Sequence, residues 1–491
     1  MQSVTGLLLS LGLFLVIVRL VRTYYRLVSI PGPFLAGFTD FWRFRAQNSA
    51  GYSGRLVQLH QRYGKLVRIG PNHVSISDPK AIPNVYTTNR VWAKANSYGP
   101  AAPVSKGRAV PSIIAMSESQ HTAVRRSVGS AFTTNSLLDY ESAIEATGND
   151  LLKVLENQAT VDITYYLQLW AIDVLMQIAF SESLGFLEKC ADVDGILDAI
   201  VGRFDHWGHW AAMPTLDYIF HKSPLAQFFT KKADSALARV SMAKIKSRSV
   251  SHSQLKKKDL MQKFLDGQTK HPDLVSQDEI LGIIMSTIGA GADTTAGTLT
   301  YTLYLLCQCP DALKKLQVEL QDGLAQGTLS YPPRWVEVNN LPYLGAVLKE
   351  SMRLMPIAAW GLDRIVPEGG ATIGGTFIPG GTVVGCHIDS VMQDKEVYGE
   401  DVATFRPDRW LDASTEQRRR MDQAFIAFSA GKRICMGIHI AWLELKKALP
   451  LLVMNFEMSL VNPDQKVADE FRISAVKYAP PIWMHLQKKV P

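Results

Sequence analysis

The longest apolar stretch of the chain lies at its N-terminus. Val4–Val18 carry no charge, and Leu20 and Val21 extend the run past Arg19. This length is near the lower limit for a helix that crosses a bilayer. The positive charges follow the run, which reverses the layout of a cleaved signal peptide, the alternative interpretation. By the positive-inside bias the body stays in the cytosol, and we predict one N-terminal transmembrane helix.

Two prolines separate this run from the rest of the chain. Pro31 and Pro33 cannot continue a helix, because proline lacks an N–H donor and fixes its backbone angle. We therefore predict three parts. They are a membrane anchor with its basic flank at 1–28, a stiff proline hinge at 29–36, and a catalytic domain at 37–491.

Short apolar segments predict two small β regions in that domain. Leu66–Ile69 and Val74–Ser77 flank Gly-Pro-Asn, which is the pattern of a hairpin that opens the body. Ala371–Ile373 and Thr376–Ile378 flank two glycines, a turn that tolerates positive φ. Helical periodicity dominates elsewhere, so the predicted fold class is an α-rich α+β body.

The longest predicted helix of the body covers Ser276–Cys309. Ser276 and Glu279 form a capping-box pattern at its start, and Pro310 closes it. A helix of about thirty residues runs roughly 45 Å, which is long enough to cross the whole body. We expect this helix to carry residues of the functional site.

Aromatic residues gather at 204–229. Such a cluster fits either the core of a helical region or an apolar lip that touches a membrane. The sequence leaves both interpretations open.

The net charge of +7 does not point to nucleic acid. The basic runs at 256–258 and 418–420 contain no interleaved aromatics, so we interpret both as solvated faces. A mildly basic body suits an anionic membrane surface or an acidic protein partner better. The five cysteines show no disulfide-framework spacing, which indicates a reducing compartment.

The strongest chemical pattern is the segment FSAGKRICMG at Phe428–Gly437. Gly431 and Gly437 let backbone N–H groups approach the sulfur of Cys435, and the following helix presents its positive end. Both features favour a thiolate; the alternative is that Cys435 is a small buried hydrophobic residue. The segment matches F-x-x-G-x-R-x-C-x-G and resembles the haem-binding sequence of the cytochrome P450 family, which implies that Cys435 is the iron ligand.

A second segment, AGADTT at Ala290–Thr295, lies in the middle of the long predicted helix. Its small residues allow close approach to a flat cofactor, and Thr294 is able to hydrogen-bond a distorted helical turn. The alternative is a kink in an ordinary buried helix. The segment resembles the family's oxygen-activation sequence, which implies that Thr294 delivers a proton and Asp293 relays protons.

A third pattern joins two distant segments. Glu350 and Arg353 are three residues apart and share one face of a predicted helix, although an exposed pair of this kind would contribute little. The segment 405–410 resembles the family's F-x-P-E-R-F sequence, which implies that Arg409 completes a buried Glu–Arg–Arg network. Trp410 replaces the commoner Phe. We assign this network a structural role.

The resemblance also implies contacts to the two propionates of the haem. The residues that fit this role are His121, Arg125, Arg364 and Arg433. His121 stands where many family members have Trp, and the alternative for it is an ordinary surface histidine. The positive charges near Arg125, Lys432 and Arg433 flank the face nearest the sulfur, where an acidic flavoprotein is expected to dock.

The resemblance covers nearly the whole chain and implies the cytochrome P450 fold around one haem b. The sequence at 289–297 and 366–373 is most similar to that of fungal members, including pisatin-demethylase-like enzymes. The implied activity is that of a haem-thiolate monooxygenase that inserts one atom of O2 into a lipophilic small molecule. Its electrons come from NADPH through NADPH-cytochrome P450 reductase.

The remaining expectations concern place and pathway. They are a single-pass protein of the endoplasmic reticulum membrane with a cytosolic catalytic domain, and a role in fungal secondary metabolite biosynthesis. The substrate pocket is expected between 290–294, 357–360 and 108–117. Two rival functions are a haem-thiolate isomerase or dehydratase, against which the pair Asp293 and Thr294 argues, and a haem sensor or carrier without turnover.

Overall fold

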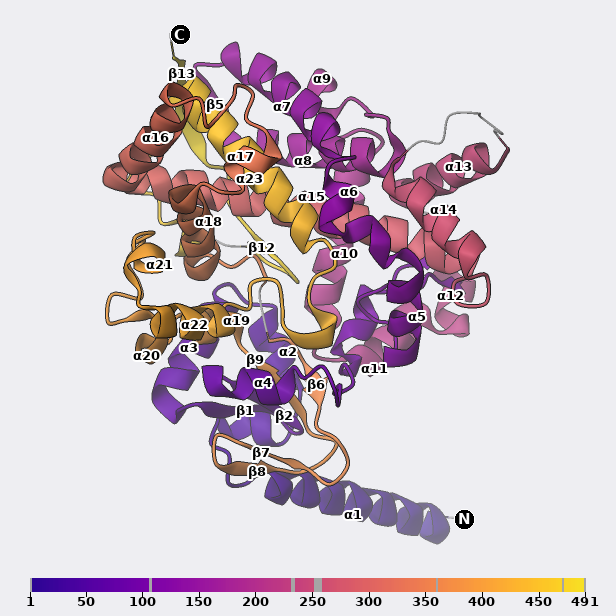
Figure 1. Cartoon of the computed structure of the whole chain (residues 1–491). Helices are drawn as coiled ribbons and strands as arrows, with labels where there is room; N and C mark the ends of the chain where they lie inside the picture. Colours follow the sequence, from indigo (N-terminus) through magenta and orange to yellow (C-terminus); the bar gives the residue numbers. More distant parts are fainter. Residues whose placement is uncertain are drawn as a thin grey trace.

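The computed structural model describes residues 2–105, 108–230, 235–250, 258–358, 361–469 and 472–489. Lys256 and Lys257 of the predicted solvated run lie outside these ranges, as do Ala359 and Trp360 of the predicted pocket wall. Figure 1 shows a mainly helical upper part above a lower part that contains the largest sheet. The N-terminal helix projects from the base of the lower part.

The N-terminal apolar run forms helix α1, Gln2–Arg26. Its last turn is fastened to the body by Arg68, whose guanidinium donates to the carbonyl oxygens of Tyr24 at 2.9 Å and Gly37 at 3.1 Å. Leu27 and Ile30 are both buried directly after the helix. The segment around the two prolines is therefore packed against the body on the β-sheet side.

The long predicted helix is confirmed as α15, Gln277–Gln308. Ser276 caps it: the backbone N–H of Glu279 donates to Ser276 Oγ at 3.2 Å, and the Ser276 N–H donates to Glu279 Oε2 at 2.8 Å. The helix continues without interruption through the AGADTT segment. The predicted turn distortion is therefore not seen as a break in the helix.

Two glycines allow α15 to lie directly against its surroundings. A Cβ at Gly282 would overlap the carbonyl oxygen of Pro111, and a Cβ at Gly297 would lie 2.5 Å from Ile357 Cδ1. Both distances are too short for any larger residue without movement of the neighbour. The loop before α5 and the segment after α18 thus contact α15 on either side of AGADTT.

Helix α8, Ile163–Phe180, is the main packing partner of α15 in the largest core cluster. By length and composition alone, α8 is apolar enough to cross a membrane. However, 72% of its residues are buried inside the body. An all-round apolar helix with this burial is a core helix.

The largest sheet has the strand order β1-β2-β9-β6. The predicted hairpin is confirmed as β1, Leu66–Gly70, and β2, His73–Ile76. Strand β9, Val383–Cys386, adds in parallel to β2, and β6, Arg364–Ile365, adds antiparallel to β9. This sheet carries Arg364 toward the candidate site.

The second predicted hairpin is also confirmed, as β7, Ala371–Ile373, and β8, Thr376–Ile378. The expectation that a β element opens the body is wrong, because α2, Phe41–Gln47, and α3, Tyr52–Tyr63, precede the sheet. In α3 the buried positions recur at helical spacing, and the helix packs on β1. The sequence did not predict α3, because the helix is short and mixes polar with apolar residues.

Other elements position the residues discussed below. They are α5 (Glu118–Val128), α10 (Ile196–Trp210), α11 (Pro214–Asp217), η5 (Tyr218–Lys222), α12 (Pro224–Thr230), α18 (Pro342–Leu354), α21 (Arg409–Asp412), α22 (Thr415–Ala424), η6 (Gly431–Arg433), α23 (Ile438–Asn455) and β12 (Lys477–Tyr478). A three-stranded sheet, β10-β13-β5, lies near the C-terminus and contains Phe456–Leu460, Trp483–Lys488 and Thr160–Asp162.

The aromatic cluster at 204–229 divides into two parts. Trp207 on α10 is buried in a small core cluster, whereas Tyr218 and Phe220 on η5 are exposed. Phe228 on α12 has 76% of its surface exposed. The first part is helix core, and the second part forms an exposed apolar surface.

Candidate functional site

Cys435 lies in a tight loop directly before α23. Its backbone N–H donates to the carbonyl oxygen of Phe428 at 2.9 Å, and Gly431 in the loop has φ +67°, where a Cβ would overlap the backbone of Tyr86. Only glycine fits both the dihedral angle and this close approach. The loop therefore holds the cysteine at a fixed position at the start of α23.

The thiol of Cys435 has a polar environment on one side. Burial raises its pKa, whereas hydrogen bonds from the backbone N–H groups of Gly437 and Ile438 and the charge of Arg125 act in the opposite direction. Protein surrounds the sulfur, yet the residue is exposed. The two properties agree if the sulfur faces an internal space. Such a sulfur is placed to act as a ligand, with two N–H groups that stabilise its negative charge.

Two of the predicted cofactor-binding cations lie beside this loop. Arg433 is buried, and its Nε donates to Glu118 Oε1 of α5 at 2.8 Å. Arg125, on the same helix as Glu118, donates from Nη1 to the carbonyl oxygen of Lys432 at 3.1 Å. Helix α5 and the cysteine loop are thus tied together by both arginines.

A third predicted cation, Arg364, is also buried and lies 5.1 Å from the ring centroid of Tyr86. It is paired by an isolated β-bridge with Lys94, a residue that the sequence did not single out. Lys94 donates to the carbonyl oxygen of Ile114 at 2.9 Å. Burial, and then the charges of Arg364 and Arg433, hold the pKa of Lys94 well below its usual range.

His121 lies among these cations as a neutral side chain. It is buried on α5, so the alternative of a surface histidine does not hold, and its Nδ1 has no hydrogen-bond partner among the described residues. Burial, followed by the charges of Arg433 and Lys94, lowers the pKa of His121 to about 3. All four predicted residues are therefore brought together, with Lys94 as a fifth member.

The buried position of Arg433 corrects one expectation, namely that its charge adds to a positive surface near the sulfur. The guanidinium of Arg433 is engaged by Glu118 and by the carbonyl oxygen of Met116 at 2.7 Å, so its charge does not contribute to a surface near the sulfur. Arg126 on α5 is exposed instead. A surface of positive charge on this side rests on Arg125, Arg126 and Lys432.

Asp293 and Thr294 lie in the middle of α15. Thr294 Oγ1 donates to the carbonyl oxygen of Ala290 at 2.7 Å, one turn earlier. Asp293 is buried, and its Oδ2 accepts a hydrogen bond from the Tyr478 hydroxyl at 2.7 Å. Tyr478, on β12 near the C-terminus, is a contact that no sequence motif indicated.

The next residue of the segment links α15 to the helix that follows Cys435. Thr295 Oγ1 lies 2.7 Å from Glu444 Oε2 on α23, and both side chains are buried. Glu444 Oε1 has no hydrogen-bond partner among the described residues. Burial raises the pKa of Glu444 to about 8, so this acid is mainly protonated at neutral pH. The two chemical segments are thus joined through a neutral acid.

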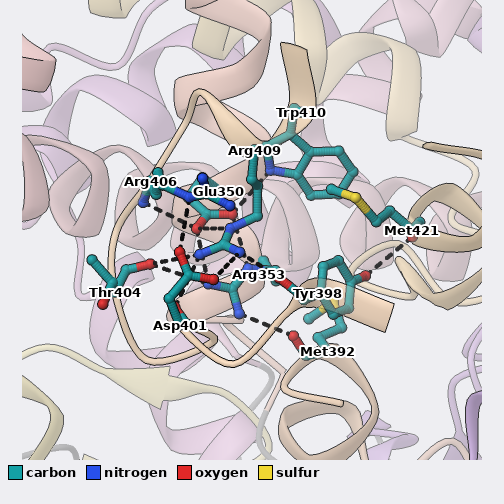
Figure 2. Close-up of polar contacts among 10 residues, drawn as sticks. All are labelled: Glu350, Arg353, Met392, Tyr398, Asp401, Thr404, Arg406, Arg409, Trp410 and Met421. Carbon is teal, nitrogen blue, oxygen red and sulfur yellow. Dashed lines mark hydrogen bonds and ion pairs between the residues drawn. The ribbon is translucent and has the colours of Figure 1, made fainter. Parts of the chain in front are cut away.

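The predicted Glu–Arg–Arg network is present, as Figure 2 shows. Arg353 forms two hydrogen bonds of 2.8 Å to the carboxylate of Glu350, and Arg409 from α21 donates to Glu350 Oε1 at 2.8 Å. Arg409 also pairs with Asp401 at 2.9 Å. The side chains of Glu350 and Arg353 are completely buried, so the alternative of an exposed pair is excluded.

Trp410 belongs to this network as well. Its indole N–H donates to Glu350 Oε2 at 2.9 Å, a hydrogen bond that a phenylalanine is unable to make. The departure from the family's sequence pattern therefore adds a donor to the buried carboxylate.

Comparison with known proteins gives one consistent result. A family model described as cytochrome P450 matches residues 41–483. A "Cytochrome P450 monooxygenase" of Aspergillus terreus is 35% identical over 463 residues, which cover 92% of this chain and 94% of the relative. The cytochrome P450 monooxygenase pkfB of Emericella nidulans is 33% identical, over 96% of this chain and 94% of the relative. The family match extends from the start of α2 to the start of β13.

Proposed function

Because this chain belongs to the cytochrome P450 family, whose relatives named above are monooxygenases, we propose that it is a haem-thiolate enzyme that inserts one oxygen atom into a lipophilic small molecule. The observation that carries the proposal is the position of Cys435 in the tight loop directly before α23, where the backbone N–H groups of Gly437 and Ile438 favour its thiolate form. This is the environment that a thiolate ligand of iron requires.

The residues present fit a haem b. Cys435 supplies a soft sulfur donor, and a bound metal ion offsets the cost of deprotonating a buried thiol. Arg364 and Arg433 are buried cations, Lys94 lies half-buried beside them, and Glu118 compensates one of these groups. The Nδ1 atom of His121, which has no hydrogen-bond partner among the described residues, lies among them. Two propionate groups would supply the missing negative charge. We assign this role to His121, Arg125, Arg364 and Arg433, with Lys94 as a further contact.

A bound haem supplies the iron at which O2 is activated, and a thiolate ligand favours cleavage of the O–O bond. The protein must bring protons to this side of the haem. We assign this task to the hydroxyl of Thr294 and the carboxylate of Asp293. Both residues lie on α15, the helix that packs against α23, and Asp293 accepts a hydrogen bond from the Tyr478 hydroxyl. The segment that contains Ile357 contacts α15 beside them and provides an apolar wall.

The test is the spectrum of the ferrous carbon monoxide complex. Cys435→Ser should abolish the strongly red-shifted Soret band, because thiolate ligation produces that band. The matched control is Cys307→Ser on α15, a partly buried cysteine outside the site, which should keep it. A Cys435→Ser protein that retains the band contradicts the proposal.

We propose further that NADPH-cytochrome P450 reductase delivers the electrons. Arg125, Arg126 and Lys432 provide positive charge on the side of the Cys435 loop, which suits an acidic partner. Reduction that slows as the salt concentration rises would support this surface.

We also propose that α1 anchors the protein in the endoplasmic reticulum membrane, with the body in the cytosol. The described apolar side chains of α1 include exposed Phe14 and Leu15, and the exposed aromatics of η5 and α12 offer a second membrane contact. Deletion of residues 2–21 keeps the turn that Arg68 binds and should weaken membrane sedimentation while haem content stays unchanged. The fungal relatives suggest a role in secondary metabolism, which metabolite comparison with and without the gene would test.

A further inference from the structure

Arg203 is a partly buried cation on α10, and the described part of the chain offers it no counter-ion. Its Nε donates to the carbonyl oxygen of Ala101 at 3.0 Å, and its Nη2 donates to Ser112 Oγ at 2.9 Å. No carboxylate of the described residues lies within 4 Å of it, and burial alone lowers the pKa of Arg203 to about 10. A desolvated guanidinium that meets only neutral acceptors is costly to maintain.

The position of this cation is next to the reactive segment. Its Nη1 lies 4.0 Å from the place that a Cβ on Gly289 would take. Gly289 directly precedes Ala290–Thr294 and lies one turn before Asp293 on the same face of α15. Ser112 belongs to the loop expected to line the substrate pocket. Arg203 therefore bridges that loop and α15.

The neighbouring charges do not neutralise Arg203. Asp217 is engaged by His206 at 2.7 Å and by Lys222 at 3.1 Å. Burial and the charge of Arg203 lower the pKa of Lys222, while Asp217 raises it. Arg203 is thus close enough to affect Lys222, while Asp217 is already paired with other residues. The positive charge of Arg203 remains available for an anion.

We propose that Arg203 and Ser112 bind a carboxylate of the substrate, which is therefore an amphiphilic acid with an apolar body. The inference rests on the proposed monooxygenase function and narrows its substrate class. A guanidinium binds a carboxylate through two parallel hydrogen bonds, and the Ser112 hydroxyl is able to donate a third. Tyr98, Trp207 and the partly buried Ile114 form an apolar cluster around the same loop.

The placement also sets a distance. Gly289 and Thr294 are five residues apart, so roughly 7.5 Å of helix separates the level of the cation from the level of the proton-delivering hydroxyl. A substrate held at its carboxylate would thus present to the haem a carbon several bonds away from the acid group.

The test measures ligand binding to the haem-loaded protein through the shift of its Soret band. The probes are medium-chain fatty acids and arylalkanoic acids, each compared with its own methyl ester. Acids should bind the parent protein about 10- to 100-fold more tightly than their esters, because the ester loses the charge-assisted hydrogen bonds. This comparison needs no variant and therefore does not depend on the folding of a mutant.

Variants then assign the preference to the residue. Arg203→Gln should bring the ratio of acid to ester affinity close to one, Arg203→Lys should keep part of it, and the exposed control Arg62→Gln should leave it unchanged. If Arg203 merely braces the loop, Arg203→Gln weakens acids and esters equally, which overturns the proposal. Parent protein that binds no acid more tightly than its ester also overturns it. The carbon monoxide band separates these results from failure of the proposed function, since it would persist in all of these cases.

Discussion

Two buried glutamates, Glu350 and Glu444, show how differently the protein treats the same side chain. Glu350 receives hydrogen bonds from Arg353, Arg409, Trp410 and the backbone N–H of Arg406. Glu444, equally buried on α23, has a single hydrogen-bond partner among the described residues, the hydroxyl of Thr295, and a pKa raised to about 8.

The difference lies in the donors around each carboxylate and not in its depth. Around Glu350 every acceptor site is used by a cation or an N–H group, so charge can be kept inside the protein and fixes the chain between α18 and α21. Around Glu444 none of the described residues supplies a cation, and the acid holds its proton instead. The network around Glu350 is a rigid structural element. Glu444, in contrast, is a titratable group between the AGADTT segment of α15 and the helix that follows Cys435.

The largest effect is expected from breaking the charged arrangement. Glu350→Gln leaves two buried guanidinium groups without their anion and should cost about 3–5 kcal/mol, against a typical total stability of about 5–15 kcal/mol. We expect little protein with full haem content, measured as haem per polypeptide, and a lower midpoint in denaturant. The control is Glu416→Gln in an exposed pair with Arg419, which should leave stability nearly unchanged. Equal behaviour of the two variants would contradict the structural role.

Thr294→Ala tests the region of α15 beside Glu444, where the polar side chains have few hydrogen-bond partners among the described residues. A positioned proton donor is typically worth about 10²–10⁴ in rate, so product formed per NADPH consumed should fall and released hydrogen peroxide should rise, with haem content unchanged. Thr298→Ala removes a hydroxyl one turn later that bonds the carbonyl oxygen of Thr294, and it should keep the ratio near that of the parent. An unchanged ratio in Thr294→Ala would show that its hydroxyl does not control proton delivery.

Glu444→Gln should alter how stability depends on pH. With a pKa of about 8 in the folded state and 4.5 in the unfolded state, Glu444 keeps a proton between these values that the unfolded chain has released. Stability of the parent therefore falls as pH rises through this window, by about 1.4 kcal/mol per unit, and glutamine removes this term. The variant should gain about 2 kcal/mol relative to the parent between pH 6 and pH 8 in denaturant titrations. A constant difference would mean that Glu444 is already ionised.

The smallest effect is expected from Trp410→Phe. It removes one donor to Glu350 but leaves both arginines and an aromatic ring at the position, so the loss should be about 1.5 kcal/mol. Trp483→Phe at an exposed position is the control and should change the melting temperature little. A loss as large as that of Glu350→Gln would show that the indole, and not charge pairing, dominates the network.

The sequence predicted the elements whose signals are local. The capping box at Ser276 and Glu279, the turn glycines between β7 and β8, and the spacing of Glu350 and Arg353 each depend on residues a few positions apart, and the structure confirms all of them. Arg409 was found because a resemblance to the family linked its segment to that helix.

Contacts between distant segments could not be predicted in this way. Lys94 reaches the cation group through a β-bridge to Arg364, and Tyr478 reaches Asp293 from the other end of the chain. Neither residue stands in a pattern with its sequence neighbours. Charge excess was equally hidden, since the lack of a counter-ion at Arg203 becomes visible only when α10 and the loop at Ser112 are placed together.

The two glycines of α15 restrict how this protein is able to evolve. A slip of one residue would rotate the helix by roughly 100° and advance it by about 1.5 Å, so that a side chain would meet Pro111 where Gly282 now lies, and another would meet Ile357 at Gly297. Insertions and deletions between these two positions are thus blocked at both ends. Descendants of this enzyme should change their substrates by substitution along α15, while the number of residues between the two glycines stays constant.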